Sequence, residues 1–281
     1  MEHGQTHTCR KNAFLRALAF ASNLDGLLTK TLSELIKPHI TSPEVCLAIA
    51  RQVYEEALHV DSYSCMIEAL SFNPEEVYGL YRKDKHLYYK NQTVLKSVSK
   101  IATPGFKTGT FHNDQLFLEA CTTNLVLEGI FFYSVFLIFY NFGRLNKMPG
   151  SKEMIQFINR DEDLHVALFV NMINAIKEEQ PELWTKELQE MISRNIVDSV
   201  NMEYEWGLSC IGDGMLGITP SGLKEYLQFI GDVRLHSIGL PKVWNGQNPF
   251  PWIDEMTQGN MIEVNFFEGR VKEYQTGTLE W

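Results

Sequence analysis

Two Glu-x-x-His motifs are the residues of this 281-residue chain best suited to chemistry. One contains Glu56 and His59, and the other contains Glu162 and His165. Residues three apart lie one turn apart on the same face of a helix, so each pair can contact one ion. A single copy is a weak signal. Two copies 106 residues apart, each in a helix that must also face a core, together predict a metal site.

Acids stranded in apolar helices are the candidates for the remaining ligands. Glu128 is the only charged residue from 120 to 143, and Asp25 is the only one from 18 to 28. An ionised carboxylate is costly to bury unless it is paired or binds a metal. Two Glu-x-x-His motifs with one carboxylate from each of two further helices form the ligand set of dimetal bundles, and these donors suit iron or manganese. We therefore predict a dimetal-carboxylate centre formed by Asp25, Glu56, His59, Glu128, Glu162 and His165.

Each of these residues, taken singly, also has a structural interpretation. Asp25 could end a helix before Gly26, and Glu128 could pair with Arg144 or another buried base. A lone histidine on an apolar face is usually a hydrogen-bonded core residue. The combined pattern favours the metal site. The other histidines lack an acid at this spacing and are expected to be structural or exposed: His3, His7, His39, His86, His112 and His236.

Helices are the elements that must position these residues. Helical apolar spacing and the breaks between segments predict helices over 12–36, 42–70, 73–101, 113–145, 151–179, 181–212 and 219–238. Ser42-Pro43 and Thr219-Pro220 are typical helix starts. Strand-like alternation of useful length is missing. The sequence thus predicts an all-α fold, with one helical domain over 1–245 and an irregular C-terminal tail over 246–281.

Composition excludes several classes of protein. The hydrophobic content of 44% and the charged content of 21% are those of a globular chain, and the net charge of −10 argues against binding to nucleic acid. Five scattered cysteines without a Cys-x-x-Cys pair argue against a disulfide framework or a zinc ribbon. The stretch 125–142 is apolar enough for a membrane span, but it contains Glu128. We expect a buried helix in a cytoplasmic enzyme with no membrane partner.

These residues resemble the radical-generating small subunit of class I ribonucleotide reductase, a member of the ferritin-like superfamily. The likeness covers most of the chain, and the spacings of 31 residues from Asp25 to Glu56 and 34 from Glu128 to Glu162 are also similar. The resemblance implies a ferritin-like helical bundle. It is carried by the segments 14–25, 56–63, 128–136 and 158–165, and near the end by 239–242, 248–252 and 265–268.

The resemblance also implies roles for residues outside the ligand set. Tyr63, one turn after His59, is expected to be oxidised to a stable radical, although in some relatives the oxidising equivalent stays on the metals. Asp161 is expected to orient a ligand imidazole, that of His59, and Tyr274 in the tail is expected to pass the radical to the large subunit. The apolar pocket around the radical is expected to contain Phe132, Phe136 and Ile158.

Partners follow from the same resemblance: a second copy of this chain, and a large catalytic subunit that holds the nucleotide, converts ribonucleotides to deoxyribonucleotides and binds the tail. Iron is the expected metal. Mn/Mn and Mn/Fe centres stay open, and a manganese centre would also imply a flavoprotein activase. The family usually has a tryptophan before the first ligand, whereas all five tryptophans here follow Asp25. The transfer route therefore stays open, as do two alternatives, a dimetal ligand-binding oxidase and an iron-storage protein.

Overall fold

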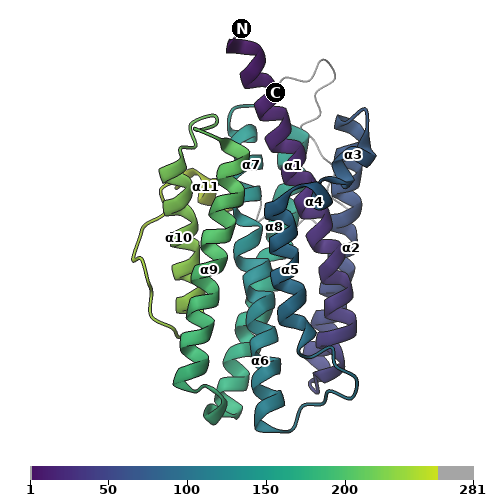
Figure 1. Cartoon of the computed structure of the whole chain (residues 1–281), viewed down its shortest axis with the longest axis vertical. Coiled ribbons are helices and arrows are strands. Elements are labelled where there is room, and N and C mark those ends of the chain that lie inside the picture. Colours follow the sequence, from purple (N-terminus) through teal and green to yellow (C-terminus); the bar gives the residue numbers. More distant parts are fainter. Residues whose placement is uncertain (1, 259–281) are drawn as a thin grey trace.

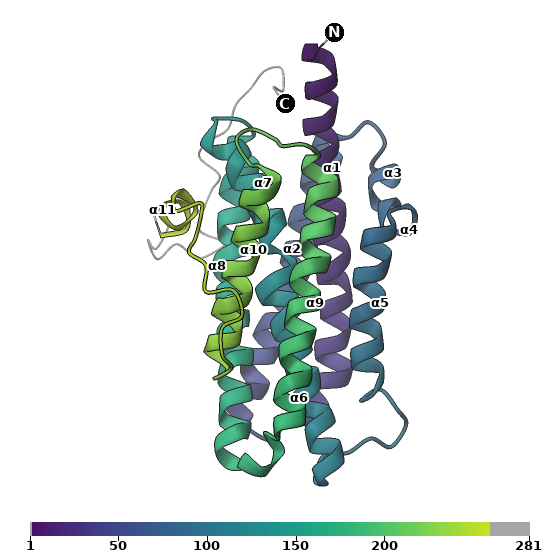
Figure 2. The ribbon, with the colours of Figure 1, turned by 60° about the vertical axis from the view of Figure 1, so that its left-hand side comes forward.

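Long helices running side by side form the fold, as the two views in Figures 1 and 2 show. The computed structural model describes residues 2–258. Within them the only β pairing is an isolated bridge between Met215 and Ile218, so the predicted all-α class is confirmed. The elements are α1 (Glu2–Thr31), η1 (Leu32–Ile36), η2 (Lys37–His39), α2 (Pro43–Leu70), α3 (Pro74–Tyr78), α4 (Leu80–Lys83), α5 (Lys85–Ser99), α6 (Phe111–Val126), η3 (Leu127–Phe131), α7 (Tyr133–Arg144), α8 (Pro149–Glu179), η4 (Pro181–Leu183), α9 (Lys186–Ile211), α10 (Pro220–Ser237) and α11 (Trp252–Gln258).

Two of the predicted helix starts have the expected capping geometry. The hydroxyl of Ser42 accepts a hydrogen bond from the Val45 N–H at 3.3 Å, and the hydroxyl of Thr219 accepts one from the Gly222 N–H at 3.1 Å. In both helices proline occupies the first turn, where its missing N–H costs nothing. These caps fix where α2 and α10 begin.

The single helix predicted over 73–101 is wrong, because the chain breaks there into α3, α4 and α5. Gly79 separates the first two pieces. Asp84 starts the third, since its carboxylate accepts hydrogen bonds from the N–H groups of His86 and Leu87 at 2.9 and 3.4 Å. The same carboxylate pairs with Arg16 of α1, which anchors this corner to the bundle.

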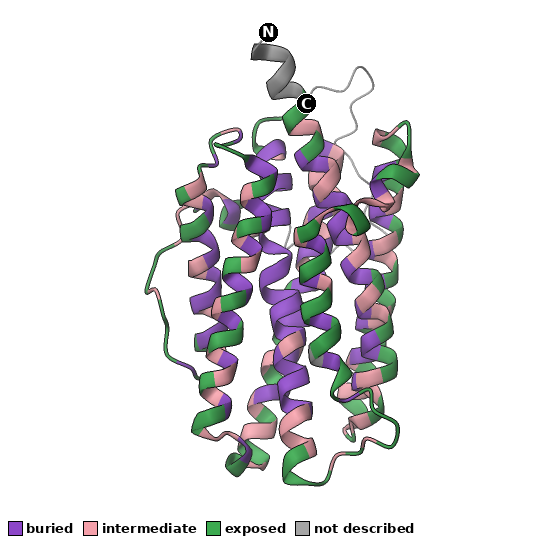
Figure 3. Cartoon of the chain, in the orientation of Figure 1, coloured by how far each residue is buried: buried purple, intermediate pink, exposed green. Residues whose placement is uncertain are grey.

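The helix predicted over 113–145 is interrupted by η3, a five-residue π-helical turn that separates α6 from α7. This long apolar segment, Phe111–Arg144, passes a length and composition test for a membrane span, but its most apolar window is wholly buried in the protein. Figure 3 shows the buried residues gathered at the centre of the bundle. Burial supports the predicted core helix of a soluble protein over a membrane span.

The C-terminal part of the described chain runs over the outside of the bundle, as Figures 1 and 2 show. It includes the short helix α11, within the stretch 246–281 for which the sequence suggests no regular structure. Residues 259–281, and with them Tyr274, lie outside the described residues. The division into a domain and a tail stays a prediction.

Candidate metal centre

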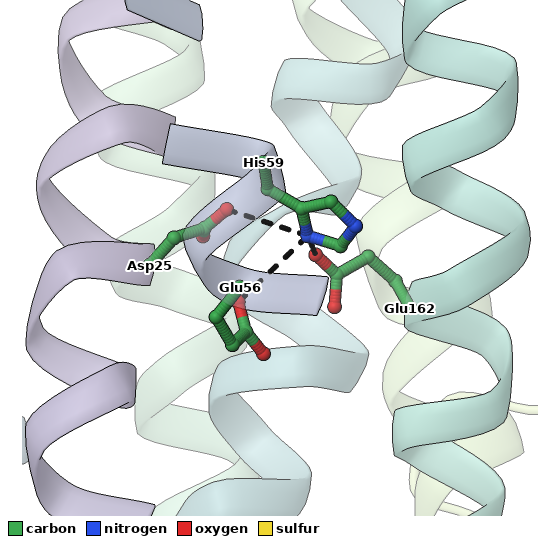
Figure 4. A group of neighbouring side chains, drawn as sticks. All are labelled: Asp25, Glu56, His59 and Glu162. Atoms are coloured by element: carbon green, nitrogen blue, oxygen red, sulfur yellow. Dashed lines mark ion pairs between the residues drawn. The ribbon is translucent and has the colours of Figure 1, made fainter. Parts of the chain in front are cut away.

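Four elements bring all six predicted ligands to the middle of the bundle, where each is at most 2% exposed. Asp25 comes from α1, Glu128 comes from η3, and the two Glu-x-x-His motifs come from α2 and α8. Their ligand atoms form two groups compatible with a metal ion. The first, drawn in Figure 4, is Asp25, Glu56, His59 and Glu162, and the second is Glu56, Glu128, Glu162 and His165.

Glu56 and Glu162 belong to both groups, and each directs one oxygen to each imidazole. Nδ1 of His59 lies 3.2 Å from Oε1 of Glu162 and 3.8 Å from Oε2 of Glu56. Nδ1 of His165 lies 2.9 Å from Oε2 of Glu162 and 3.3 Å from Oε1 of Glu56. This arrangement suits two carboxylates that bridge a pair of ions.

The remaining two carboxylates each belong to one group. Oδ2 of Asp25 lies 3.6 Å from Nδ1 of His59, and Oε2 of Glu128 lies 4.0 Å from Nδ1 of His165. Both imidazoles therefore turn Nδ1 toward the carboxylates. Each ring thereby leaves Nε2 free for a partner on its outer side.

An acid from the opposite helix faces each outer nitrogen. Oδ2 of Asp161 lies 3.5 Å from Nε2 of His59, while its other oxygen accepts a hydrogen bond from Arg160 at 3.0 Å. Oε2 of Glu55 lies 3.1 Å from Nε2 of His165. Such outer acids fix the tautomer and orientation of ligand imidazoles.

Sequence reasoning missed Glu55, although a signal for it exists. When 54–59 is aligned with 160–165, Glu55 occupies the position of Asp161, immediately before the motif glutamate. The repeat therefore begins one residue before the first ligand of each motif and includes the acid that faces an imidazole.

Gln52 is a second residue that the sequence analysis missed. Its amide donates to Oε1 of Glu128 at 2.5 Å and to Oε1 of Glu56 at 3.3 Å. The partner of Glu128 is thus an amide and not Arg144, whose guanidinium donates to Asn141 at 3.0 Å. The available signal was the position of Gln52 one turn before Glu56 on the same helix face.

Buried polar atoms without a hydrogen-bond partner converge on the centre. They are Oδ1 and Oδ2 of Asp25, Oε2 of Glu56, Oε2 of Glu128, Oε1 of Glu162, and both ring nitrogens of His59. Desolvated polar atoms of this kind are costly unless something satisfies them. A pair of cations would do so, and the oxygen and imidazole donors fit first-row transition metals.

The pKa values reflect the crowding of four carboxylates. Burial raises the pKa of Asp25 and of Glu128 well above the usual range, and the charge of Glu56 adds to both shifts. Burial alone would lower the pKa of His165, but the charge of Glu162 and their hydrogen bond outweigh it and raise that pKa to about 10. Without metal the centre therefore retains protons that bound cations must displace.

Tyr63 lies fully buried beside this cluster. Its hydroxyl has no hydrogen-bond partner, and burial raises its pKa well above the usual range, with further contributions from the charges of Asp25 and Glu162. The expected pocket residues are buried as well: Phe132, Phe136 and Ile158. The phenol is thus protonated and excluded from solvent.

Comparison with known proteins gives one consistent result. The pattern of the family described as "Ribonucleotide reductase, small chain" matches residues 7–249. The chain is 37% identical over 273 residues to "Ribonucleoside-diphosphate reductase subunit beta" of Chlamydia pneumoniae, covering 96% of this chain and 79% of that protein. It is 32% identical to the subunit of the same name from Treponema pallidum, over 94% and 75% of the two chains. The structure of the ribonucleotide reductase R2 subunit from Clostridium botulinum superposes with a TM-score of 0.82 at 30% identity, over 89% of this chain and 78% of that one.

Proposed function

The chain belongs to the ribonucleotide reductase small-chain family and is the small subunit of an oxidoreductase, and from this premise we propose that it forms and stores a radical on Tyr63. A large catalytic subunit would use that radical to reduce ribonucleotides to deoxyribonucleotides. The observation that carries the proposal is the sharing of Glu56 and Glu162 between two ligand groups beside a buried tyrosine.

The six residues of the centre would hold two metal ions. His59 and Asp25 would bind the first, His165 and Glu128 would bind the second, and the two shared glutamates would bridge them. The bound pair would supply the oxidising power through its reaction with oxygen or a reduced oxygen species. Iron is the metal we expect, and the same donors accept manganese.

Tyr63 must lose a proton together with its electron, because its raised pKa keeps the phenol neutral before oxidation. The product is a neutral phenoxyl radical. The proton would leave toward the carboxylates of the centre, whose charges, that of Asp25 first, act on this phenol. The apolar surroundings then exclude the solvent reductants that would quench the radical.

Transfer out of the centre would begin at His59 and Asp161, the pair that leads from the ligand shell toward the surface. We propose that the tail carries the radical onward through Tyr274 and binds the large subunit, and that the small subunit acts as a homodimer. A manganese-loaded centre would require a flavoprotein activase as a further partner.

Electron paramagnetic resonance of metal-loaded, oxidised protein tests the radical assignment. Tyr63→Phe should abolish the tyrosyl signal while two metal ions per chain remain bound. Tyr140→Phe is the matched control, because Tyr140 is equally buried but its hydroxyl donates to Asn159 at 2.9 Å. A Tyr63→Phe protein that still supports full nucleotide reduction would place the oxidising equivalent on the metals instead.

Tyr274→Phe separates radical formation from radical transfer. We expect the Tyr63 signal to persist and nucleotide reduction with the large subunit to be lost. A synthetic peptide of residues 259–281 should compete with the small subunit for the large one. Full activity of Tyr274→Phe would contradict this route.

A further inference from the structure

The π-helical turn η3 carries Glu128 and interrupts an otherwise α-helical segment. Turns of this kind are rare, and many of them lie at functional sites. The wider turn changes the direction in which its side chains leave the helix. Whatever holds η3 in this form therefore also determines where the Glu128 carboxylate lies.

Arg234 of α10 holds η3 from one side. Its Nε donates a hydrogen bond to the carbonyl oxygen of Gly129, the residue after Glu128, at 3.0 Å. The side chain is only 9% exposed, and a guanidinium so deeply buried is stable only when its donors find acceptors. Arg234 is thus a buried, hydrogen-bonded residue of the protein interior. It contacts the residue that directly follows a predicted ligand.

Gly129 makes this close approach possible. A Cβ atom at this position would lie 2.7 Å from Nε of Arg234 and 2.9 Å from its Cδ, closer than real contacts allow. The backbone of Gly129 has a conformation that other residues also adopt, so backbone strain does not explain why glycine stands here. The space that Arg234 occupies explains it.

The same guanidinium is also connected to α8, the helix that carries Glu162 and His165. It donates to the hydroxyl of Tyr133, which in turn donates to Oδ1 of Asp163 at 3.3 Å. Asp163 directly follows Glu162. A chain of hydrogen bonds therefore connects the backbone beside one ligand to the turn of α8 that carries a bridging ligand.

A second buried cation holds η3 from another helix. Nζ of Lys90, on α5, donates to the carbonyl oxygen of Phe131 at 3.5 Å and pairs with Glu203 of α9. Glu203 also accepts a hydrogen bond from the backbone N–H of Ser134 at 3.3 Å, just beyond the turn. Backbone groups within and beyond the π turn are thus satisfied by charged side chains from neighbouring helices.

Resting on the proposed dimetal centre, we infer that Arg234 is a positioning residue that holds η3 in the register directing Glu128 to the ion bound with His165. Gly129 is the position that admits it. Loss of this contact should affect the second ion and spare the first, because Glu128 belongs only to the second ligand group.

Cobalt(II) titration of the metal-free, full-length chain tests the inference, since visible absorption reports the ligands around each ion. Arg234→Gln removes the guanidinium, and Gly129→Ala keeps Arg234 but displaces it. Glu128→Ala supplies the spectrum of a chain that lacks this ligand. Arg144→Gln is the matched control, because Arg144 also donates to a backbone carbonyl, that of Leu216 at 3.3 Å, outside the centre.

We expect Arg234→Gln and Gly129→Ala to keep the first ion and to bind the second about 10- to 100-fold more weakly, the range typical for residues that support metal ligands. Their spectra should approach that of Glu128→Ala, Arg234→Lys should recover part of the affinity, and Arg144→Gln should match the wild type.

Wild-type affinity for both ions in Arg234→Gln and Gly129→Ala would overturn the inference and leave the dimetal centre standing. A wild-type chain that bound no pair of ions would overturn the proposed function itself. If Arg234→Gln lost its helical circular dichroism, the test would rest on the cobalt affinity of Gly129→Ala, which removes no charge.

Discussion

The carboxylate of Glu55 lies 3.1 Å from Nε2 of His165, on the outer side of an imidazole whose Nδ1 faces the metal centre. Its other oxygen accepts a hydrogen bond from Arg51 at 2.8 Å. Asp161 stands in the same relationship to His59 on the opposite helix. Each imidazole is thus connected through an acid of the other helix to an arginine at the surface.

Glu55→Ala should weaken binding of the ion held with His165 by about 10- to 100-fold, because the imidazole loses the acceptor that fixes its tautomer. Equilibrium dialysis with metal analysis measures the effect, and Glu55→Gln should retain part of the affinity. Glu68→Ala, an exposed acid of the same helix, is the control and should bind both ions normally. Equal affinities in Glu55→Ala and Glu68→Ala would show that the contact does not position His165.

Substitution of single ligands should reveal which carboxylates are shared. Asp25→Ala and Glu128→Ala should each lose one ion per chain, whereas Glu162→Ala should lose both at concentrations that saturate the wild type. Metal stoichiometry after gel filtration distinguishes these outcomes. A Glu128→Ala chain that bound two ions with unchanged affinity would contradict the ligand assignment.

The metal-free chain should become less stable as the pH rises from 6.5 to 9.5. The pKa of His165 is raised to about 10 by Glu162, against about 6.5 for an unperturbed histidine. The folded state therefore binds this proton more tightly, and the stabilisation is complete below the unfolded pKa and lost as the pH rises through the folded one. The raised pKa values of Asp25 and Glu128 act in the same direction.

Thermal unfolding of chelator-treated protein at the two pH values measures this effect, with the metal-loaded protein as the control. Bound ions keep the ligands deprotonated, so the loaded protein should show a smaller pH dependence. A melting temperature of the metal-free chain that rose with pH, or the same dependence in both forms, would refute the prediction.

Asp84→Ala should destabilise the fold by about 1–2 kcal/mol without changing metal stoichiometry, because α5 loses its N-terminal cap. Asp84→Asn keeps a capping side chain but loses the ion pair with Arg16, and should cost less. Urea denaturation followed by circular dichroism gives both values. Equal losses in the two variants would show that the ion pair, and not the cap, accounts for the stability.

The sequence contained most of what was needed to place the centre. The six ligands were recognisable because a charge inside an apolar helix, such as Asp25 or Glu128, has few stable explanations. The motif spacing then placed Glu56 with His59 on one helix face and Glu162 with His165 on another. The structure brings all six side chains together, and their binding of metal stays a prediction until it is measured.

Contacts between distant segments could not be predicted in the same way. Gln52 and Glu55 look like ordinary polar residues of α2 until α8 and η3 are packed against them. The π turn at Glu128 could not be predicted from the residues around it. Its carbonyl groups at Gly129 and Phe131 accept hydrogen bonds from side chains of α10 and α5, which are distant in the sequence. Gly79 and Asp84 are residues at which helices often end or begin. The helical spacing of apolar residues continues through both, and it therefore predicted one uninterrupted helix.

The contact between Gly129 and Arg234 joins positions 105 residues apart in the chain. It therefore has a consequence for how the sequence can vary among relatives. A side chain larger than hydrogen at 129 is incompatible with an arginine in this pose, so position 129 cannot change while Arg234 is kept in place. Across related small subunits, glycine should therefore stand at the first position wherever arginine stands at the second. An alignment of family members sorted by the residue at 234 would display that linkage directly.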